Sequence, residues 1–397
     1  MEPNTVRIDR SGAAPVFIFA DSFNVAVHMI DRHIDEGRSG KAAFITERET
    51  IDYGQLAERV NRCGNALLDA GIPVGGRVLM IVKDCPEFVY LYYGAIKAGI
   101  VPVPINTLLR AADYQYMIDD SDCAALIYSP EFEDEVRPAL EGATHKVPFV
   151  ALTGGDGGLG DMIADASDGL DPHPSDAMAD CFWLYSSGST GRPKGTVHRQ
   201  RDLLVSAVLY SESVLQITED DIMFSAAKLF FAYGLANSMN FPLMYGASAV
   251  LSDERPTPEM TFRIIAKHRP TIYFGVPTLY AAQCRALETE KPDLSSLRAC
   301  VSAGEALPAS IFERWKEVVG VPPVDGIGST EGTHIFISNH PDNAKAGTSG
   351  RIVPGYDARI VDDDGNDVTP GEVGRLLVKG QSMAAYYWNR PERTAQT

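Results

Sequence analysis

The sequence has no run of about 18 or more apolar residues, which is the length that a helix needs to cross a bilayer. No basic segment followed by an apolar core stands near Met1, so we find no secretory signal. Cysteine is scarce, and no C-x-x-C pair occurs among the six cysteines, at 63, 85, 123, 181, 284 and 300. Most of them have apolar neighbours, which predicts buried, reduced thiols in a cytoplasmic protein. Because no long apolar run occurs, we expect no membrane among its partners.

Positive charge is also in deficit. The chain has 35 Lys and Arg against 53 Asp and Glu, a formal net charge of −18. A nucleic-acid backbone would be repelled, so non-specific nucleic-acid binding is excluded. At 397 residues the chain exceeds the size at which one hydrophobic core keeps growing, and we expect more than one packed unit.

From Thr50 onward, helical and strand patterns alternate along the chain. Apolar residues recur at helical spacing over 56–68, Gly71 stands where a C-cap belongs, and an apolar segment over 77–82 reads as a strand. This alternation predicts an α/β fold with two packed mixed or parallel β-sheets flanked by helices.

The domain boundaries follow from changes in composition. Residues 153–179 are rich in Gly, Asp, Ser and Pro and read as a connection between two α/β units. After Gly347, short strands over 356–361 and 374–378 predict a small antiparallel β-barrel-like unit. We therefore expect three subdomains, at 1–170, 171–346 and 347–397.

The most informative stretch is FWLYSSGSTGRPKGTVH, from Phe182 to His198. Its apolar start predicts a buried strand, and Lys194 follows a run of small residues: Ser186, Ser187, Gly188, Ser189, Thr190 and Gly191. Glycines let the backbone approach a ligand, successive N–H groups form an anion site, and the lysine adds a charge. These features favour a polyphosphate, although the spacing differs from that of a Walker A loop. On composition alone, a flexible connector is the alternative.

An acidic protein that binds a polyphosphate needs a locally positive site. Lys194, His198, Arg199 and Arg201 are expected to form one. For the two arginines, a solvated helix start is an equal alternative.

Two further segments read as strand ends that meet a ligand. VDGIGSTE, at 324–331, offers a carboxylate, and Mg²⁺ requires a carboxylate or two while phosphates and waters fill its other positions. A capping Ser-Thr-Glu is the alternative. SAGEALP, at 302–308, predicts a strand that ends in a glycine turn before a helix started by proline, and ligands of α/β sheets bind beyond such ends.

The stretch KLFFAYGLAN, at 228–237, is the candidate for specificity. Small residues beside flat ones can form a slot for an aromatic ring, although an aromatic-rich stretch is more often core. His334 is a candidate donor to a carboxylate, with a satisfied core histidine as the alternative.

The 182–198 string closely resembles the phosphate-loop signature of the adenylate-forming superfamily, which includes acyl- and aryl-CoA synthetases, peptide-synthetase adenylation domains and luciferases. The resemblance extends over 93–106, SAGEALP and VDGIGSTE. It implies that Asp325 and Gly326 face an adenine, that Thr330 touches the α-phosphate and that Glu331 helps hold magnesium. It also implies that the segment with Gly304, Glu305 and Ala306 lines the nucleotide and acyl sites.

Within that superfamily, KLFFAYGLAN and the downstream GSTExxHIF resemble the benzoate-CoA ligase branch. The resemblance implies a pocket for an aryl acid, formed by Phe231, Ala232, Tyr233, Ala303, Gly328 and His334. It implies ATP- and Mg²⁺-dependent adenylation of a benzoate and transfer to coenzyme A, with Lys194, Thr330 and Glu331 as catalytic residues. Gly332-Thr333 replaces the larger apolar residues often found in that branch, which leaves hydroxy- and amino-benzoates open.

Members of the superfamily continue through a ribose-binding aspartate, a hinge and a mobile C-terminal domain. We therefore expect residues 1–397 to be the large N-terminal domain, which binds ligands but turns over poorly. Two alternatives are an amidase-type hydrolase with a Ser–Ser–Lys arrangement and a non-catalytic nucleotide-binding module. For the amidase, Lys83 and Lys97 lack a glycine-rich setting. The sequence leaves open the metabolic role and the oligomeric state, a homodimer included.

Overall fold

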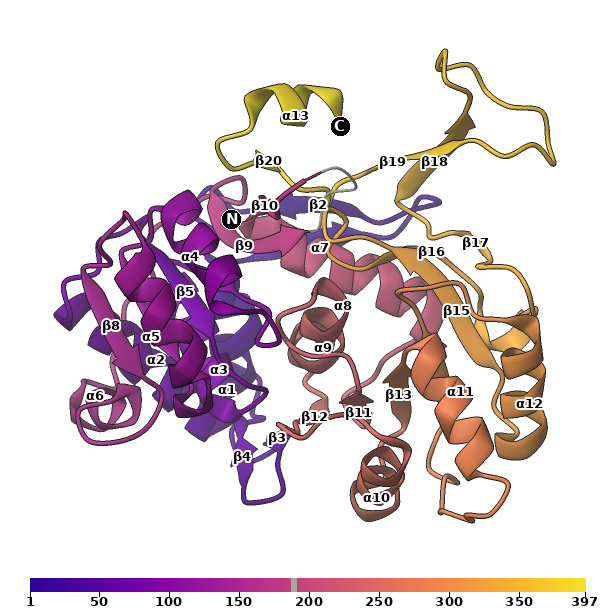
Figure 1. Ribbon diagram of the computed structural model, residues 1–397, viewed down its shortest axis with the longest axis horizontal. Helices are drawn as coiled ribbons and strands as arrows, with labels where there is room; N and C mark the ends of the chain where they lie inside the picture. The colour runs from indigo at the N-terminus through magenta and orange to yellow at the C-terminus, as the bar shows by residue number, and fades with distance from the viewer. Residues whose placement is uncertain (187–190) are drawn as a thin grey trace.

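The computed structural model describes residues 1–186 and 191–397, and its strands form sheets packed among helices (Figure 1). The large sheet has nine strands within the described residues, in the order β17-β16-β15-β14-β13-β11-β12-β3-β4. The strands of this sheet are β3 (Ala42–Ile45), β4 (Thr50–Asp52), β11 (Ile222–Ser225), β12 (Ser248–Val250), β13 (Ile272–Gly275), β14 (Ala299–Ser302), β15 (Pro323–Gly328), β16 (Ile335–Ser338) and β17 (Arg351–Ile352). Its central strands, from β15 to β3, pair in parallel, and its outer strands pair antiparallel.

Smaller sheets complete the architecture. The small parallel sheet has the order β6-β5-β7-β8. A three-stranded antiparallel sheet, which we call the site sheet, has the order β20-β10-β9. The strands of these two sheets are β5 (Arg77–Ile81), β6 (Val101–Pro104), β7 (Ala125–Tyr128), β8 (Phe149–Leu152), β9 (Asp180–Ser186), β10 (Lys194–Arg199) and β20 (Tyr386–Tyr387). Two antiparallel ribbons are β1 (Val6–Asp9) with β2 (Val16–Phe19) and β18 (Tyr356–Val361) with β19 (Arg375–Gly380).

Helices cover the sheets, and the helices between residues 53 and 165 lie with the small parallel sheet at the left of Figure 1. The α-helices are α1 (Arg32–Asp35), α2 (Tyr53–Asp69), α3 (Pro86–Lys97), α4 (Ala111–Ser121), α5 (Glu133–Gly142), α6 (Leu159–Asp165), α7 (Gln200–Tyr210), α8 (Ala232–Leu235), α9 (Phe241–Tyr245), α10 (Pro258–His268), α11 (Pro277–Ala286), α12 (Ala309–Val319) and α13 (Pro391–Gln396). Short π-helical and 3₁₀ turns are η1 (Val27–Asp31), η2 (Pro130–Phe132), η3 (Ser211–Leu215), η4 (Ala236–Asn240) and η5 (Pro341–Asn343).

Helices α2 and α3 show how local signals set this framework. Asp52 and Gln55 form a capping box at the start of α2, which satisfies backbone groups that a helix end leaves open. The two helices approach closely where Gly94 faces Gly64, because neither residue has a side chain. A Cβ on Gly94 would lie only 2.9 Å from the Gly64 nitrogen. Gly99, at a φ of +78°, turns the chain from α3 into β6, as a left-handed C-cap residue does.

The predicted α/β class with packed sheets is confirmed, and the expected antiparallel strands after Gly347 are β18 and β19. Strands β3 and β4, from inside residues 1–170, pair into the large sheet beside β12. The three subdomain boundaries stay a prediction. The six cysteines are free, and all but Cys85 are buried. Among the described residues, no helix is both long and apolar enough to span a membrane.

Candidate functional site

Strands β9 and β10 of the site sheet position the residues on either side of the predicted phosphate loop. Ser186, at the end of β9, lies opposite Lys194, at the start of β10. The predictions for Ser187, Gly188, Ser189 and Thr190 fall outside the described residues, and Gly191 is exposed.

Lys194 and Glu331 lie side by side although they come from two separate motifs. Lys194 Nζ is 3.5 Å from Glu331 Oε1, and both side chains are largely shielded from solvent. Ser186 Oγ donates to the same carboxylate oxygen at 3.4 Å and also contacts Thr196 Oγ1 at 3.1 Å. Burial raises the pKa of Glu331, but the hydrogen bond from Tyr387 and the charge of Lys194 outweigh it, so that the net pKa lies below its ordinary value.

Tyr387 was not predicted from the sequence, yet it contacts both charged residues. Its hydroxyl donates to Glu331 Oε1 at 2.8 Å, and Lys194 Nζ lies 3.8 Å from its ring centroid. An aromatic run near residue 387 carries no local signal for this role, because the contact depends on the pairing of β20 with β10.

His198 differs from its expected place in a positive patch. The ring is fully buried and stacks on Phe182 with a centroid distance of 4.8 Å. Its Nε2 donates to the Thr330 carbonyl at 2.9 Å, and its Nδ1 lies 3.3 Å from Asp202 Oδ2. His198 therefore supports the backbone of Thr330 from inside the core and does not face a ligand. Arg199 precedes α7, where its N–H donates to Asp202 Oδ2.

Asp325 and Gly326 lie in β15, next to β14, whose last residue, Ser302, begins the predicted SAGEALP segment. Asp325 is 5% exposed, pairs across from Ser302 of β14, and accepts from Ser349 Oγ at 3.1 Å. Burial raises the pKa of Asp325 to about 6, although the hydrogen bond from Ser349 lowers it. Gly326 is buried, and a Cβ there would lie 2.8 Å from Ile335 Cγ2. Beyond the end of β14, the chain continues into an exposed turn, formed by Gly304, Glu305 and Ala306.

An aromatic cluster surrounds His334. Its ring stacks on Tyr233 at 5.5 Å between centroids and packs edge-on against Phe241 at 4.6 Å. His334 Nε2 lies 2.9 Å from Asn237 Oδ1, and burial lowers the pKa of His334 to about 3. The imidazole is therefore neutral at physiological pH.

The remaining aryl-pocket candidates come from α8 and from the ends of β14 and β15. Tyr233, in α8, donates through its hydroxyl to the Gly275 and Val301 carbonyls at 3.3 Å each, at the ends of β13 and β14. Gly328 lies where a Cβ would be 2.4 Å from the His334 carbonyl oxygen, so a side chain cannot be placed there without a shift. The buried Ala303 follows β14 directly, the nearly buried Ala232 starts α8, and Phe231 is 48% exposed.

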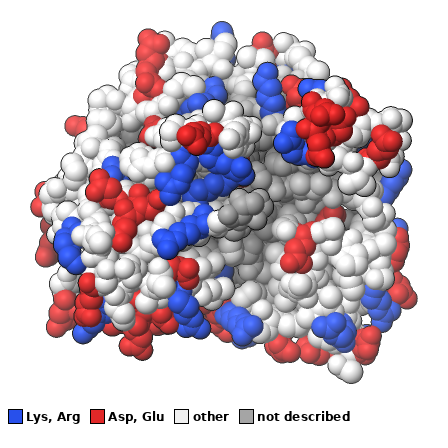
Figure 2. Space-filling model, turned by 45° about the horizontal axis from the view of Figure 1, so that its top comes forward, with Lys and Arg blue, Asp and Glu red and all other residues white. Residues whose placement is uncertain are grey.

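The charge distribution fits an anionic ligand. In Figure 2, Lys and Arg side chains group on one side of a hollow near the middle of the face, and acidic side chains occupy other parts of the rim. Within the described residues, no group of three or more His, Cys, Asp and Glu side chains could hold a metal ion. The ionised Glu331 carboxylate beside Lys194 fits a Mg²⁺ ion that arrives bound to phosphates, because Mg²⁺ needs a carboxylate or two and takes its other ligands from phosphates and water.

Comparison with known proteins identifies the family of this chain. A family described as "AMP-binding enzyme" matches residues 31–388. A benzoate–CoA ligase of Thauera aromatica is 45% identical over 393 residues, which cover 98% of this chain and 74% of that protein.

Solved structures extend the match. A crystal structure of a benzoate CoA ligase from Burkholderia xenovorans LB400 has a TM-score of 0.88 at 40% identity and covers 94% of this chain and 75% of its own. An anthranilate CoA ligase in complex with anthranoyl-AMP has a TM-score of 0.90 at 36% identity and covers 96% of this chain and 73% of its own. Neither the amidase nor the binding-module alternative gains support from these matches. The chain belongs to the AMP-binding enzyme family, within its benzoate–CoA ligase branch.

Proposed function

We propose that this protein is an ATP-dependent aryl-acid–CoA ligase that adenylates benzoate, or a hydroxy- or amino-substituted benzoate, and passes the acyl group to coenzyme A. The observation that carries the proposal is the 3.5 Å approach of Lys194 Nζ to Glu331 Oε1, which unites the phosphate-loop segment with the GSTE segment. The relatives named as benzoate–CoA ligases support the reaction class.

The proposed reaction assigns a role to each of the residues Lys194, Thr330 and Glu331. A carboxylate oxygen of the acid attacks the α-phosphorus of ATP, the bond to pyrophosphate breaks, and an aryl-adenylate forms. The thiol of coenzyme A then attacks the acyl carbon, loses its proton, and AMP leaves. The charge of Lys194 stabilises the departing pyrophosphate, and Thr330 holds the transferring phosphate together with loop amides. Glu331 would hold Mg²⁺, which, when bound, neutralises part of the phosphate charge.

The acid is proposed to bind beside His334. The flat ring of Tyr233 and the small residues Ala303 and Gly328 are proposed to form a slot for the ring of the acid, which would gain both area burial and ring–ring contact there. The adenine is proposed to meet Asp325, Gly326 and the exposed turn that follows β14. We place the reaction in the cytoplasm because the cysteines are free thiols.

The direct test is binding of a stable mimic of the reaction intermediate. We expect 5′-O-(N-benzoylsulfamoyl)adenosine to raise the unfolding temperature of the 397-residue chain, with about 2.7 kcal/mol of added stability at about 100 times its dissociation constant. Its affinity should exceed that of AMP or benzoate alone, because it joins both groups in the arrangement of the intermediate. Calorimetric titration measures the three affinities.

Two controls separate the alternatives. The matched palmitoyl analogue should bind at least tenfold more weakly, since its chain does not fit a slot for a ring. Equal affinities for AMP and for the benzoyl analogue would indicate a non-catalytic nucleotide-binding module. Hydrolysis of benzamide without ATP would indicate an amidase. Either result would overturn the proposal.

A further inference from the structure

Tyr387, in β20, joins the two charged residues of the proposed nucleotide site. Its hydroxyl contacts Glu331 Oε1 at 2.8 Å, while its ring face lies 3.8 Å from Lys194 Nζ. Tyr387 is 5% exposed, so both contacts are shielded from water. One side chain therefore acts on both charges, through its hydroxyl on the anion and through its ring on the cation.

The backbone of the same segment fixes the position of this tyrosine. Tyr387 lies opposite Thr196 in the pairing of β20 with β10, and the Trp388 N–H donates to the Gly195 carbonyl at 2.8 Å. The Ala384 N–H donates to the Glu331 carbonyl at 2.7 Å. The segment is thus tied both to the strand that carries Lys194 and to the backbone of Glu331 itself.

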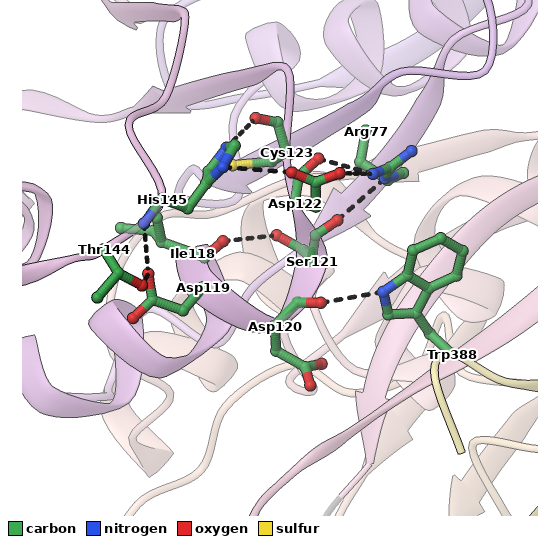
Figure 3. A network of polar contacts seen from close by, with 10 residues as sticks. All are labelled: Arg77, Ile118, Asp119, Asp120, Ser121, Asp122, Cys123, Thr144, His145 and Trp388. Carbon is green, nitrogen blue, oxygen red and sulfur yellow. Dashed lines mark hydrogen bonds and ion pairs between the residues drawn. The ribbon is translucent and has the colours of Figure 1, made fainter.

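A second anchor comes from the end of helix α4. Figure 3 shows the Trp388 indole pointing at Asp120, whose carbonyl accepts its Nε1–H at 2.9 Å. Arg390 pairs with Asp120 Oδ1 at 2.7 Å, and the Arg77 guanidinium lies 4.9 Å from the Trp388 ring centroid. Because residues before and after Tyr387 are both held by such contacts, movement of its side chain away from the site is restricted.

The electrostatics agree with a donor role for the hydroxyl. Burial and the hydrogen bond to Glu331 raise the pKa of Tyr387, so the phenol stays protonated and donates. A hydrogen bond to an ionised acceptor is stronger than one between neutral groups, and an ammonium over an aromatic face is attracted by the ring quadrupole.

We infer that Tyr387 is a positioning residue of the nucleotide site: its hydroxyl orients the Glu331 carboxylate toward the metal ion that accompanies the triphosphate, and its ring seats Lys194. This inference rests on the proposed function, since it takes the ligand to be ATP with Mg²⁺. It adds a residue from the end of the chain to a site otherwise formed by β9, β10 and the segment after β15.

The test is calorimetric titration of the 397-residue chain with ATP, with and without Mg²⁺. Tyr387→Phe removes only the hydroxyl and should weaken binding about tenfold with Mg²⁺ and less than about threefold without it. Tyr387→Leu also removes the ring face and should weaken binding about threefold even without Mg²⁺. The matched control is Tyr386→Phe, on the same strand, whose hydroxyl bonds Asp180 away from the site.

A double-mutant cycle identifies the route of the effect. If Tyr387 acts through the carboxylate, Tyr387→Phe should have no further effect on ATP binding in a Glu331→Gln background. Additive losses, or an equal loss with and without Mg²⁺, would show a merely structural role and overturn the inference. Absence of Mg²⁺-dependent ATP binding in the unaltered protein would instead contradict the proposed function. Unchanged affinity for benzoate in all variants confirms that the fold is intact.

Discussion

Asp325 is a carboxylic acid in a place where its charge is poorly solvated. Its Oδ2 accepts a hydrogen bond from Ser349, and Oδ1 has no partner within the described residues. Because burial raises its pKa to about 6, the folded chain holds this proton more tightly than the unfolded chain, whose ordinary pKa is 3.8. The free energy of unfolding therefore falls as the pH rises from about 4 to 6. Above that range the full destabilisation by the ionised Asp325 carboxylate is present.

Asp325→Asn should remove this cost, because the amide keeps the shape and the acceptor but carries no charge. We expect the variant to be roughly 2 kcal/mol more stable than the unaltered protein at pH 8, with the gap about half as large at pH 5. Urea unfolding at the two pH values measures the difference. A gap that does not change with pH would show that Asp325 is ionised at both.

At the scale of elements, the end of α4 holds strand β20 in place. Asp120 is nearly buried, and its carboxylate accepts from Tyr185 at 3.0 Å while it pairs with Arg390. Its neighbour Asp122 is 71% exposed and pairs with Arg77 at 3.2 Å (Figure 3). The Asp120 carboxylate therefore links α4 to the residues that follow β20, whereas the Asp122 carboxylate belongs to a surface ion pair.

These neighbours form a matched pair of variants. Asp120→Asn should cost about 1.5 kcal/mol of unfolding free energy, because a shielded charge-assisted hydrogen bond is weakened. Asp122→Asn should cost less than about 0.5 kcal/mol, since exposed ion pairs contribute little and Asn tolerates the left-handed φ of +50° at that position. Denaturant unfolding of both variants checks the order, and equal costs would argue against an anchor at Asp120.

Across the whole molecule, three neutral histidines link stability to pH. Burial, foremost, lowers the pKa of His28, His33 and His334 to about 3 each. Below the ordinary value of 6.5 the unfolded chain takes up these protons and the folded chain does not. Their contribution is therefore complete above pH 6.5 and is lost as the pH falls toward 3, at up to about 1.4 kcal/mol per pH unit for each histidine.

His28→Leu tests this account without removing a hydrogen bond that the structure records, because His28 Nε2 is buried and unpartnered within the described residues. The slope of unfolding free energy against pH, measured by urea unfolding between pH 6.5 and 5.5, should decrease by about 1 kcal/mol per pH unit. Asp84 and Asp325 act in the opposite direction, so the difference between variant and unaltered protein is the quantity to compare. An unchanged slope would contradict a neutral His28.

Local patterns in the sequence determined the helices, several strands and the fold class. Helix α2 covers the predicted helical pattern at 56–68, and β18 covers the predicted 356–361, because apolar spacing, prolines and glycines act over a few residues. The strings at 182–198 and 324–331 also indicated the family before any geometry was known. In the structure the two strings meet where Lys194 Nζ lies 3.5 Å from Glu331 Oε1.

Only the tertiary structure decided which distant segments pair. It placed β3 and β4 in the large sheet, buried His198 under Thr330, and brought Tyr387 from the end of the chain to β10. No local period encodes these contacts, because they depend on strand pairing and packing between residues far apart in the chain. The sequence therefore determined which chemical groups the protein carries, and long-range pairing decided which of those groups act on one another.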